Sequence, residues 1–142
     1  MNDKKILNGN AIILSIVHDV AECLIGDITP HDGVAEDEKH MLETNAFLKL
    51  VKNLPTGRMA LEFYNGFERY EEQHPGDQDA RLTKDLDKFD MIVQAYEYEE
   101  KSKKGRFLDD FFQSTRGYFK TPIVQSWDVR LRELREKLHA QS

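Results

Sequence analysis

The chain has 142 residues, a length typical of one domain, and its 26 acidic residues outnumber its 20 basic residues, giving a formal net charge of −6. This charge argues against binding to a nucleic-acid backbone, which usually requires a basic patch. Cys23 is the only cysteine, so neither an internal disulfide nor a cysteine-based zinc site can form. The longest apolar run, residues 11–17, is too short to span a membrane. We therefore expect one domain over residues 1–142, in the cytoplasm or alternatively the nucleus, that binds neither nucleic acid nor membranes.

Apolar residues recur at helical spacing along almost the whole chain. The first predicted helix carries an apolar stripe from Ile13 to Leu24, and Gly26 follows it as a C-terminal cap. A loop with Pro30 and Gly33 comes next. Further helices are predicted over about residues 36–54, 61–70, 82–96, 108–115 and 122–138. No segment shows the alternation of a strand, so the predicted fold is all-α, with about six helices.

The first predicted helix contains three side chains that are suited to binding a metal ion: His18, Asp19 and Glu22. Because helical residues advance by about 100° each, all three fit on one arc about 100° wide. A hard or borderline divalent cation suits such a mixture of nitrogen and oxygen ligands. A surface ion pair, or a buried salt bridge to an arginine, would also account for charged residues beside apolar ones.

A second cluster of carboxylates lies in "KDLDKFD", residues 84–90. Leu86 and Phe89 belong to the apolar stripe of that helix, and Asp87 lies on the shoulder of the stripe, about 100° from Leu86. We expect Asp85 and Asp90 to be solvated. Asp87 is the carboxylate whose position allows it to reach a site between helices.

These residues together resemble the HD-domain phosphohydrolases, and within them the 5′-deoxynucleotidase branch. The resemblance rests on "LSIVHDVAECLIGDITP" (14–30), "EDEKHMLE" (36–43) and "KDLDKFDMIVQAYEYE" (84–99). It implies an HD-domain helical bundle in which His18, Asp19 and Asp87 bind a metal ion and converge within a few ångströms. It further implies that Glu22 handles protons on the attacking water. By the same resemblance, Asp27 contacts the deoxyribose and disfavours a 2′-hydroxyl.

The implied function is that of a metal-dependent phosphomonoesterase, which hydrolyses deoxyribonucleoside 5′-monophosphates to deoxynucleoside and phosphate. The implied cofactor is a divalent cation, either cobalt, manganese, zinc or magnesium. Hydrolysis of a guanosine polyphosphate or a cyclic nucleotide would use the same site, although Asp27 favours the deoxynucleotide. A second alternative is a catalytically weak or inactive paralogue that acts as a helical interaction module.

The chain departs from the family pattern at its start, because no histidine precedes His18. The family pattern begins earlier, with helices that carry a first metal-binding histidine and an Arg-Trp pair near the substrate. We expect the chain to lack these N-terminal helices, to have weak activity and to form a homodimer through the exposed apolar surface. We also expect a buried Cys23, a solvated His40 and core positions for Trp127 and Leu131.

Overall fold

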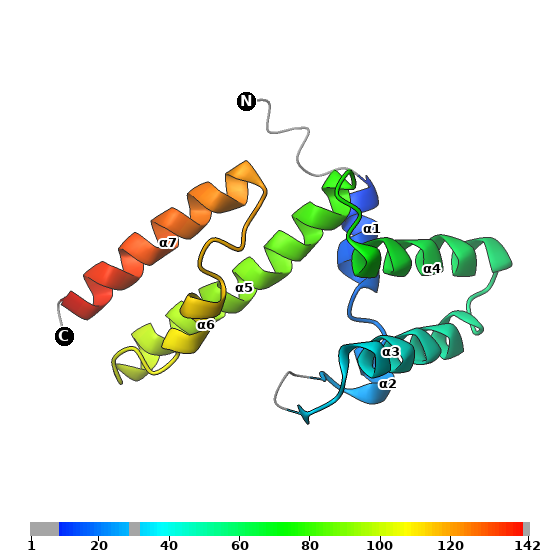
Figure 1. Cartoon of the computed structure of the whole chain (residues 1–142), viewed down its shortest axis with the longest axis horizontal. Coiled ribbons are helices and arrows are strands. Elements are labelled where there is room, and N and C mark those ends of the chain that lie inside the picture. The colour runs from blue at the N-terminus through cyan, green and yellow to red at the C-terminus, as the bar shows by residue number, and fades with distance from the viewer. Residues whose placement is uncertain (1–8, 29–31, 141–142) are drawn as a thin grey trace. The chain divides into compact units, whose positions relative to one another are not determined.

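The computed structural model describes residues 9–28 and 32–140 (Figure 1). Residues 29–31 of the predicted loop, Pro30 and His31 among them, lie outside the described residues. The described part of the chain contains seven helices and no strand, which confirms the all-α prediction: α1 (Gly9–Val17), α2 (Glu22–Ile25), α3 (Glu36–Val51), α4 (Gly57–Glu72), α5 (Gln78–Ser102), α6 (Asp109–Ser114) and α7 (Pro122–Ala140). Within these residues, no helix combines the length and the apolar character needed to cross a membrane.

The chain divides into two compact units, Met1–Ala80 and Arg81–Ser142. The first unit holds α1 to α4 and the first turn of α5, and the second unit holds the rest of α5 with α6 and α7. The prediction of one domain over the whole chain stays a prediction.

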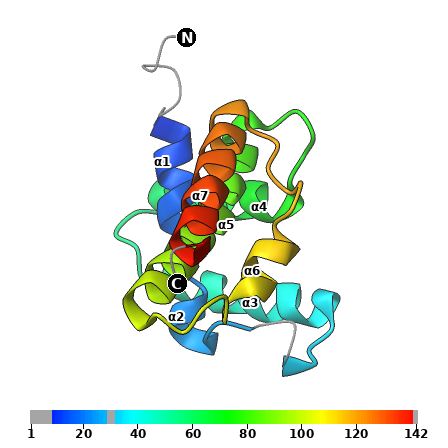
Figure 2. The same ribbon diagram turned by 90° about the vertical axis from the view of Figure 1, so that its left-hand side faces the viewer.

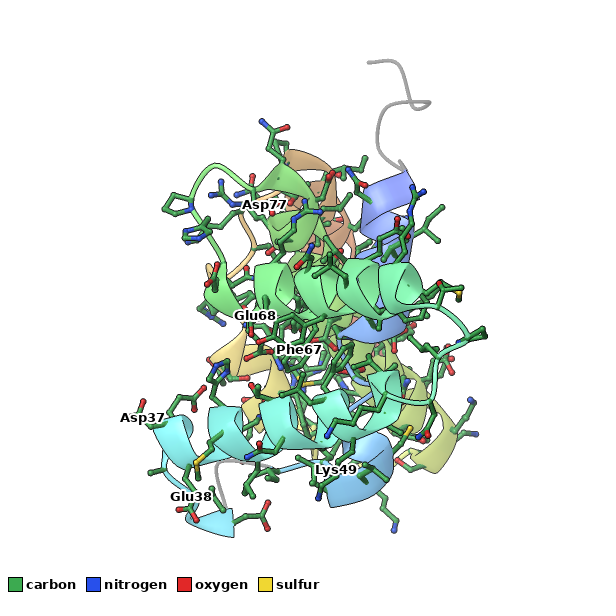
Figure 3. The ribbon with its side chains drawn as sticks, turned by 90° about the vertical axis from the view of Figure 1, so that its right-hand side faces the viewer. Asp37, Glu38, Lys49, Phe67, Glu68 and Asp77 are labelled. Atoms are coloured by element: carbon green, nitrogen blue, oxygen red, sulfur yellow. The ribbon has the colours of Figure 1, made fainter. Side chains whose placement is uncertain are left out.

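In the first unit, α4 packs against both α1 and α3. Phe67 of α4 stacks on Phe47 of α3 with 4.5 Å between the ring centroids, and Figure 3 shows Phe67 between these two helices. Figure 3 also shows Asp37 and Glu38 at one end of α3 and Lys49 at the other. This distribution of charge complements the helix dipole.

The contact between α1 and α4 depends on Gly66. A β-carbon on Gly66 would lie 3.1 Å from Cγ2 of Val17 and 3.6 Å from Cγ2 of Ile13. The first distance is shorter than an ordinary van der Waals contact, so the two helices approach more closely than a larger residue would allow. The core of this unit gathers around that contact, with Val17, Phe47 and Phe67 almost fully buried.

The predicted first helix is interrupted, so its buried face differs from the predicted stripe. Regular α-helix ends at Val17 and resumes at Glu22. The residues buried in α1 are Ala11, Leu14 and Val17, whereas Ile13, Ile16 and Leu24 of the predicted stripe are 37%, 61% and 52% exposed. Gly26 has a φ angle of 76° and ends α2, as predicted.

In the second unit, α5 and α7 run side by side in the same direction (Figures 1 and 2). Near their beginnings, Asp85 of α5 accepts hydrogen bonds from the backbone N–H groups of Lys120 (2.9 Å) and Thr121 (2.6 Å), just before α7. The prediction that Asp85 is solvated is therefore wrong, and its side chain is 2% exposed. Burial of this carboxylate is offset by the backbone donors that it satisfies at the start of α7.

Towards the ends of the same two helices, a buried ion pair joins Glu99 to Arg135. The Glu99 carboxylate accepts hydrogen bonds from Nε and Nη2 of Arg135 (2.7 and 2.9 Å), from Nε2 of His139 (2.9 Å) and from the backbone N–H of Leu108 (3.0 Å). The guanidinium of Arg135 also lies 3.8 Å from the ring centroid of Phe112. Burial would raise the pKa of Glu99, but these hydrogen bonds bring its pKa below the ordinary value of 4.5.

The apolar residues of α7 follow the prediction in part. Leu131 is buried as predicted, at 7% exposure. Trp127 is 41% exposed, although its ring lies 5.8 Å from that of Phe89 on α5. The core prediction for Trp127 is therefore wrong.

Replacement of Gly66 by leucine should destabilise the first unit. The new side chain would meet Val17 directly, and overpacking of this kind costs about 1–3 kcal/mol. A thermal melt of Gly66→Leu should show a lower Tm than that of Gly57→Leu, since a β-carbon on Gly57 meets nothing within 4 Å. Equal melting temperatures for the two variants would contradict the close approach of α1 and α4.

Replacement of Glu99 by glutamine should destabilise the protein at neutral pH by up to about 3–5 kcal/mol, because it removes the buried counter-charge of Arg135 and leaves only the more exposed Asp109 as its partner. The folded pKa of Glu99 is lowered, so its contribution is present above about pH 4.5 and is lost as the pH falls through the folded pKa. The difference in Tm between wild type and Glu99→Gln should therefore shrink in acid.

The matched control is Glu97→Gln, which removes an exposed ion pair with Lys101. Exposed pairs of this kind contribute about 0–1 kcal/mol, so this variant should melt close to wild type at every pH. A Glu99→Gln difference that stays constant from pH 7 to pH 3 would contradict the assignment.

Candidate active site

His18 and Asp19 lie in a turn between α1 and α2, not on a continuous helix as predicted. The backbone N–H of His18 still bonds to the carbonyl of Leu14 (3.0 Å) in the helical pattern. From Val20 onward the bonds tighten to three-residue spacing, as from Val20 to Val17 (3.3 Å) and from Glu22 to Asp19 (3.0 Å). The arc calculated for a regular helix therefore does not apply, and the turn itself presents the two side chains.

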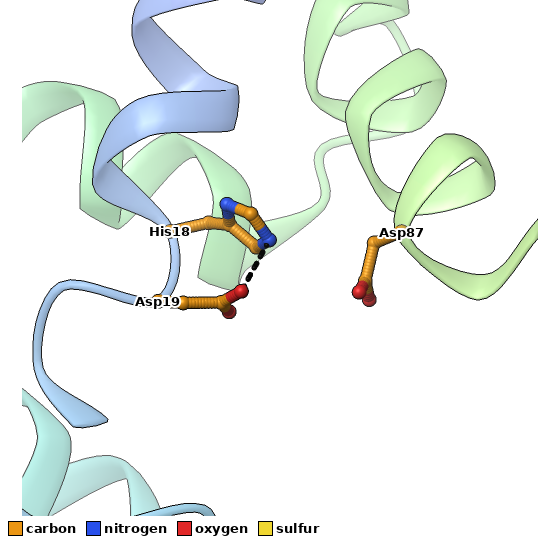
Figure 4. A group of neighbouring side chains, drawn as sticks. All are labelled: His18, Asp19 and Asp87. Atoms are coloured by element: carbon orange, nitrogen blue, oxygen red, sulfur yellow. Dashed lines mark ion pairs between the residues drawn. The ribbon is translucent and has the colours of Figure 1, made fainter. Parts of the chain in front are cut away.

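The His18 ring is fixed by three neighbours. Its Nδ1 donates a hydrogen bond to the carbonyl oxygen of Ser15 (3.0 Å), since a carbonyl only accepts. Its Nε2 lies 2.9 Å from Oδ2 of Asp19, the pair that Figure 4 marks with a dashed line. Its ring packs against Tyr70 with 4.8 Å between centroids. A carbonyl partner on Nδ1 leaves Nε2 as the ring atom that is available to a cation.

The exposure of this pair suits a metal ligand set at a protein surface. The His18 side chain is 13% exposed, whereas that of Asp19 is 57% exposed. The histidine is thus held in place by the protein while the carboxylate remains accessible. The alternative of a surface ion pair also fits the contact between His18 and Asp19, so the arrangement by itself does not decide between the two predictions.

Glu22 follows the turn as the first residue of α2 and lies among other acidic groups. Its pKa is raised above the ordinary value of 4.5, first by burial and then by the negative charges of Asp19, Asp27 and Glu43. Lys39 acts in the opposite direction. The raised pKa gives Glu22 a greater tendency to hold a proton than a solvated glutamate has.

Glu43 is a member of this acidic group that sequence reasoning missed. It lies on α3 at 9% exposure, with Nζ of Lys39 at 3.7 Å, and burial raises its pKa. The signal for its burial is its spacing, because Glu43, Phe47 and Val51 recur every four residues on one face of α3.

Asp27 and Asp87 complete the predicted set. Asp27 is exposed and directly follows Gly26, beyond the end of α2. Asp87 lies on α5 in the second unit, with its side chain 31% exposed and Nζ of Lys88 3.8 Å from its Oδ2. Figure 4 draws Asp87 on that helix. The convergence of Asp87 with His18 and Asp19 stays a prediction.

Two other residues near the motif give mixed results. The prediction of a buried Cys23 is wrong: Cys23 is exposed, because the interrupted helix turns it towards solvent. The prediction of a solvated His40 is confirmed, since its side chain is 51% exposed with Oε2 of Glu71 at 3.6 Å.

The comparison with known proteins agrees with the motif. The sequence pattern of the HD domain matches residues 2–127. The protein named 5′-deoxynucleotidase HDDC2 from Xenopus laevis is 44% identical over 124 residues, which cover 87% of this chain and 60% of that protein. The protein of the same name from Dictyostelium discoideum is 39% identical over 131 residues, 90% of this chain and 67% of that protein.

A solved structure, that of HD domain-containing protein YGK1(YGL101W), matches with a TM-score of 0.71 at 26% identity, over 97% of this chain and 70% of that chain. This all-α chain, with its His-Asp doublet in a turn between helices, thus matches HD-domain proteins in both sequence and fold. The chain belongs to the HD-domain family, as its motifs predicted. It spans about three fifths of the length of the Xenopus laevis relative.

Removing the charge of Asp19 should change the pKa of Glu22. Replacing Asp19 by asparagine removes the largest of the charges that raise the Glu22 pKa, so this pKa should fall. Carboxyl carbon NMR in the presence of a chelator measures it directly. Asp37→Asn is the control, since Asp37 is not among the groups that shift Glu22. A Glu22 pKa that is unchanged in Asp19→Asn would show that burial alone raises it.

Proposed function

We propose that this HD domain hydrolyses deoxyribonucleoside 5′-monophosphates to a deoxynucleoside and inorganic phosphate. The observation that carries the proposal is the His18-Asp19 turn, with its fixed imidazole and accessible carboxylate, in a chain whose relatives are named 5′-deoxynucleotidases. Hydrolysis of a phosphate monoester needs a group to hold the phosphate and a group to take the proton of the attacking water. The residues around the turn offer both.

We assign the metal-binding role to His18, Asp19 and Asp87. One imidazole nitrogen and two carboxylates form a ligand set that fits cobalt, manganese, zinc or magnesium. The hydrogen bond from Nδ1 to the Ser15 carbonyl supports this role, because it orients the ring and leaves Nε2 for the cation. A divalent cation bound there would act as a Lewis acid on the phosphate ester.

Glu22 is the proposed general base. A base works best when its pKa lies close to the working pH, and burial together with Asp19, Asp27 and Glu43 moves the pKa of Glu22 upward in that direction. In the proposed reaction the oxygen of water attacks phosphorus, and the bond from phosphorus to the 5′-oxygen breaks. Glu22 takes a proton from the water and returns one to the leaving 5′-oxygen.

Asp27 is the proposed contact to the sugar. Its carboxylate is exposed just after α2, one turn beyond Glu22, where it is accessible to a substrate. A carboxylate close to C2′ would disfavour a 2′-hydroxyl sterically.

The ratio of dAMP to AMP hydrolysis should accordingly fall in Asp27→Ala, and an unchanged ratio would assign Asp27 another role.

The homodimer, and the location in the cytoplasm or alternatively the nucleus, stay predictions of the sequence.

The competing function, a helical interaction module without turnover, differs from the proposal in one measurable respect. A module of that kind needs neither a cation at His18 nor a proton acceptor at Glu22.

Cation binding and phosphate release together test the proposal. Titration calorimetry of the metal-free protein should show one cobalt or manganese ion bound, and phosphate release from dAMP, dCMP or dTMP should require that ion. Asp87→Ala should weaken binding of the cation by about 10–100-fold or more, as the loss of ligand support commonly does. Asp110→Ala, at an exposed aspartate of α6 in the same unit, is the matched control.

Absence of both cation binding and phosphate release from the wild-type protein would favour the interaction module. Equal cation affinity in wild type and Asp87→Ala would remove Asp87 from the ligand set.

A further inference from the structure

A groove of about 360 Å³ lies along α5 in the second unit and extends to the start of α6. Its wall on α5 is one face of the helix, because its residues recur at spacings of three and four: Asp87, Asp90, Met91, Gln94, Ala95 and Tyr98. Leu108 and Phe111 line it from the side of α6. The volume lies in the range of small-molecule sites.

The wall formed by Leu108 is held in place from within the unit. The backbone N–H of Leu108 donates to the buried carboxylate of Glu99, which is paired in turn with Arg135. The beginning of α6 is thereby tied to α5, next to the end of the groove marked by Tyr98. Fixed walls favour binding, because little conformational freedom is lost when a ligand enters.

The lining is chemically divided across the face of α5. Two aromatic side chains, Tyr98 (57% exposed) and Phe111 (41% exposed), present ring surface together with Leu108 and Met91. The other side of this face of α5 is polar and carries Asp90 and Gln94. There, Nε2 of Gln94 donates to Oδ2 of Asp90 (3.0 Å), so the amide oxygen of Gln94 is left as an acceptor.

We propose that this groove receives the nucleobase of the substrate, an inference that rests on the proposed function of the same domain. Asp87, the proposed ligand of the cation that holds the phosphate, lines one end of the groove. Gln94 lies seven residues further along α5, about 10 Å at the helical rise, which suits the span from a phosphate to its base. A nucleobase combines a flat apolar face for Tyr98 and Phe111 with a hydrogen-bonding edge for Gln94 and Asp90.

Protein NMR with two matched ligands tests this assignment without relying on turnover. The full chain, labelled with ¹⁵N and supplied with magnesium, is titrated with dAMP and separately with 2-deoxyribose 5-phosphate, which has the same sugar and phosphate but no base. Backbone amides of Gln94, Ala95, Tyr98 and Phe111 should shift with dAMP and stay in place with the base-free ligand. Shifts that are equal with both ligands, or a dAMP response that leaves the groove unaffected, would overturn the assignment.

Variants on exposed positions of α5 supply the second measurement. Tyr98→Ala should weaken dAMP binding by about fivefold or more, the lower end for loss of one base–aromatic stack, and should leave deoxyribose 5-phosphate unaffected. Glu97→Ala lies on the same helix but outside the groove, so it should bind both ligands as wild type does. Equal dAMP affinity in Tyr98→Ala and Glu97→Ala would also overturn the assignment.

The remaining outcomes separate this inference from the proposed function. If the amide signals of the groove residues shift with dAMP but no phosphate is released, the proposed function is contradicted and the base-binding site is supported. If phosphate is released but the amide signals of the groove residues do not shift, the proposed function is supported and the base-binding site is contradicted. Groove amides that move when the protein alone is diluted, and do not respond to dAMP, would overturn the inference in favour of a second copy of the chain as the occupant.

Discussion

The close approach of α1 to α4 at Gly66 is the constraint on which the candidate site depends. A β-carbon on Gly66 would lie only 3.1 Å from Val17, so glycine allows Val17 this close approach to α4, and Val17 is the last residue before the turn. Tyr70 lies one helical turn beyond Gly66 on the same face of α4, and there it meets the ring of His18. Packing of apolar side chains therefore decides where the imidazole lies, and the Ser15 carbonyl decides which of its nitrogens is presented.

The second unit is organised by charge to a greater degree than the first. Asp85 and Glu99 are two carboxylates of α5 that are almost completely buried, and each is stabilised by donors from a segment distant in sequence. They hold the beginning and the end of α7 against the same helix. Asp87 lies between them on α5, so a helix fixed at both ends carries the proposed third ligand. The aromatic and amide side chains of the groove follow on that helix.

The sequence predicted the all-α fold and the family because both depend on local patterns: helical spacing of apolar residues, and the motif around His18 and Asp19. It did not predict the interruption of the first helix, since the apolar pattern continues through Val20 and Ala21. Nor did it predict the burial of Asp85 or Glu99. Their partners lie about 35 residues further along the chain, and a carboxylate without a visible partner is expected to be solvated.

Anomalous diffraction from crystals of the protein grown with manganese or cobalt tests most directly whether the turn is a metal site. The account predicts one strong anomalous peak at coordinating distance from Nε2 of His18, from a carboxylate oxygen of Asp19 and from a carboxylate oxygen of Asp87. A map without a peak at His18, or with a peak that Asp87 does not contact, would contradict it.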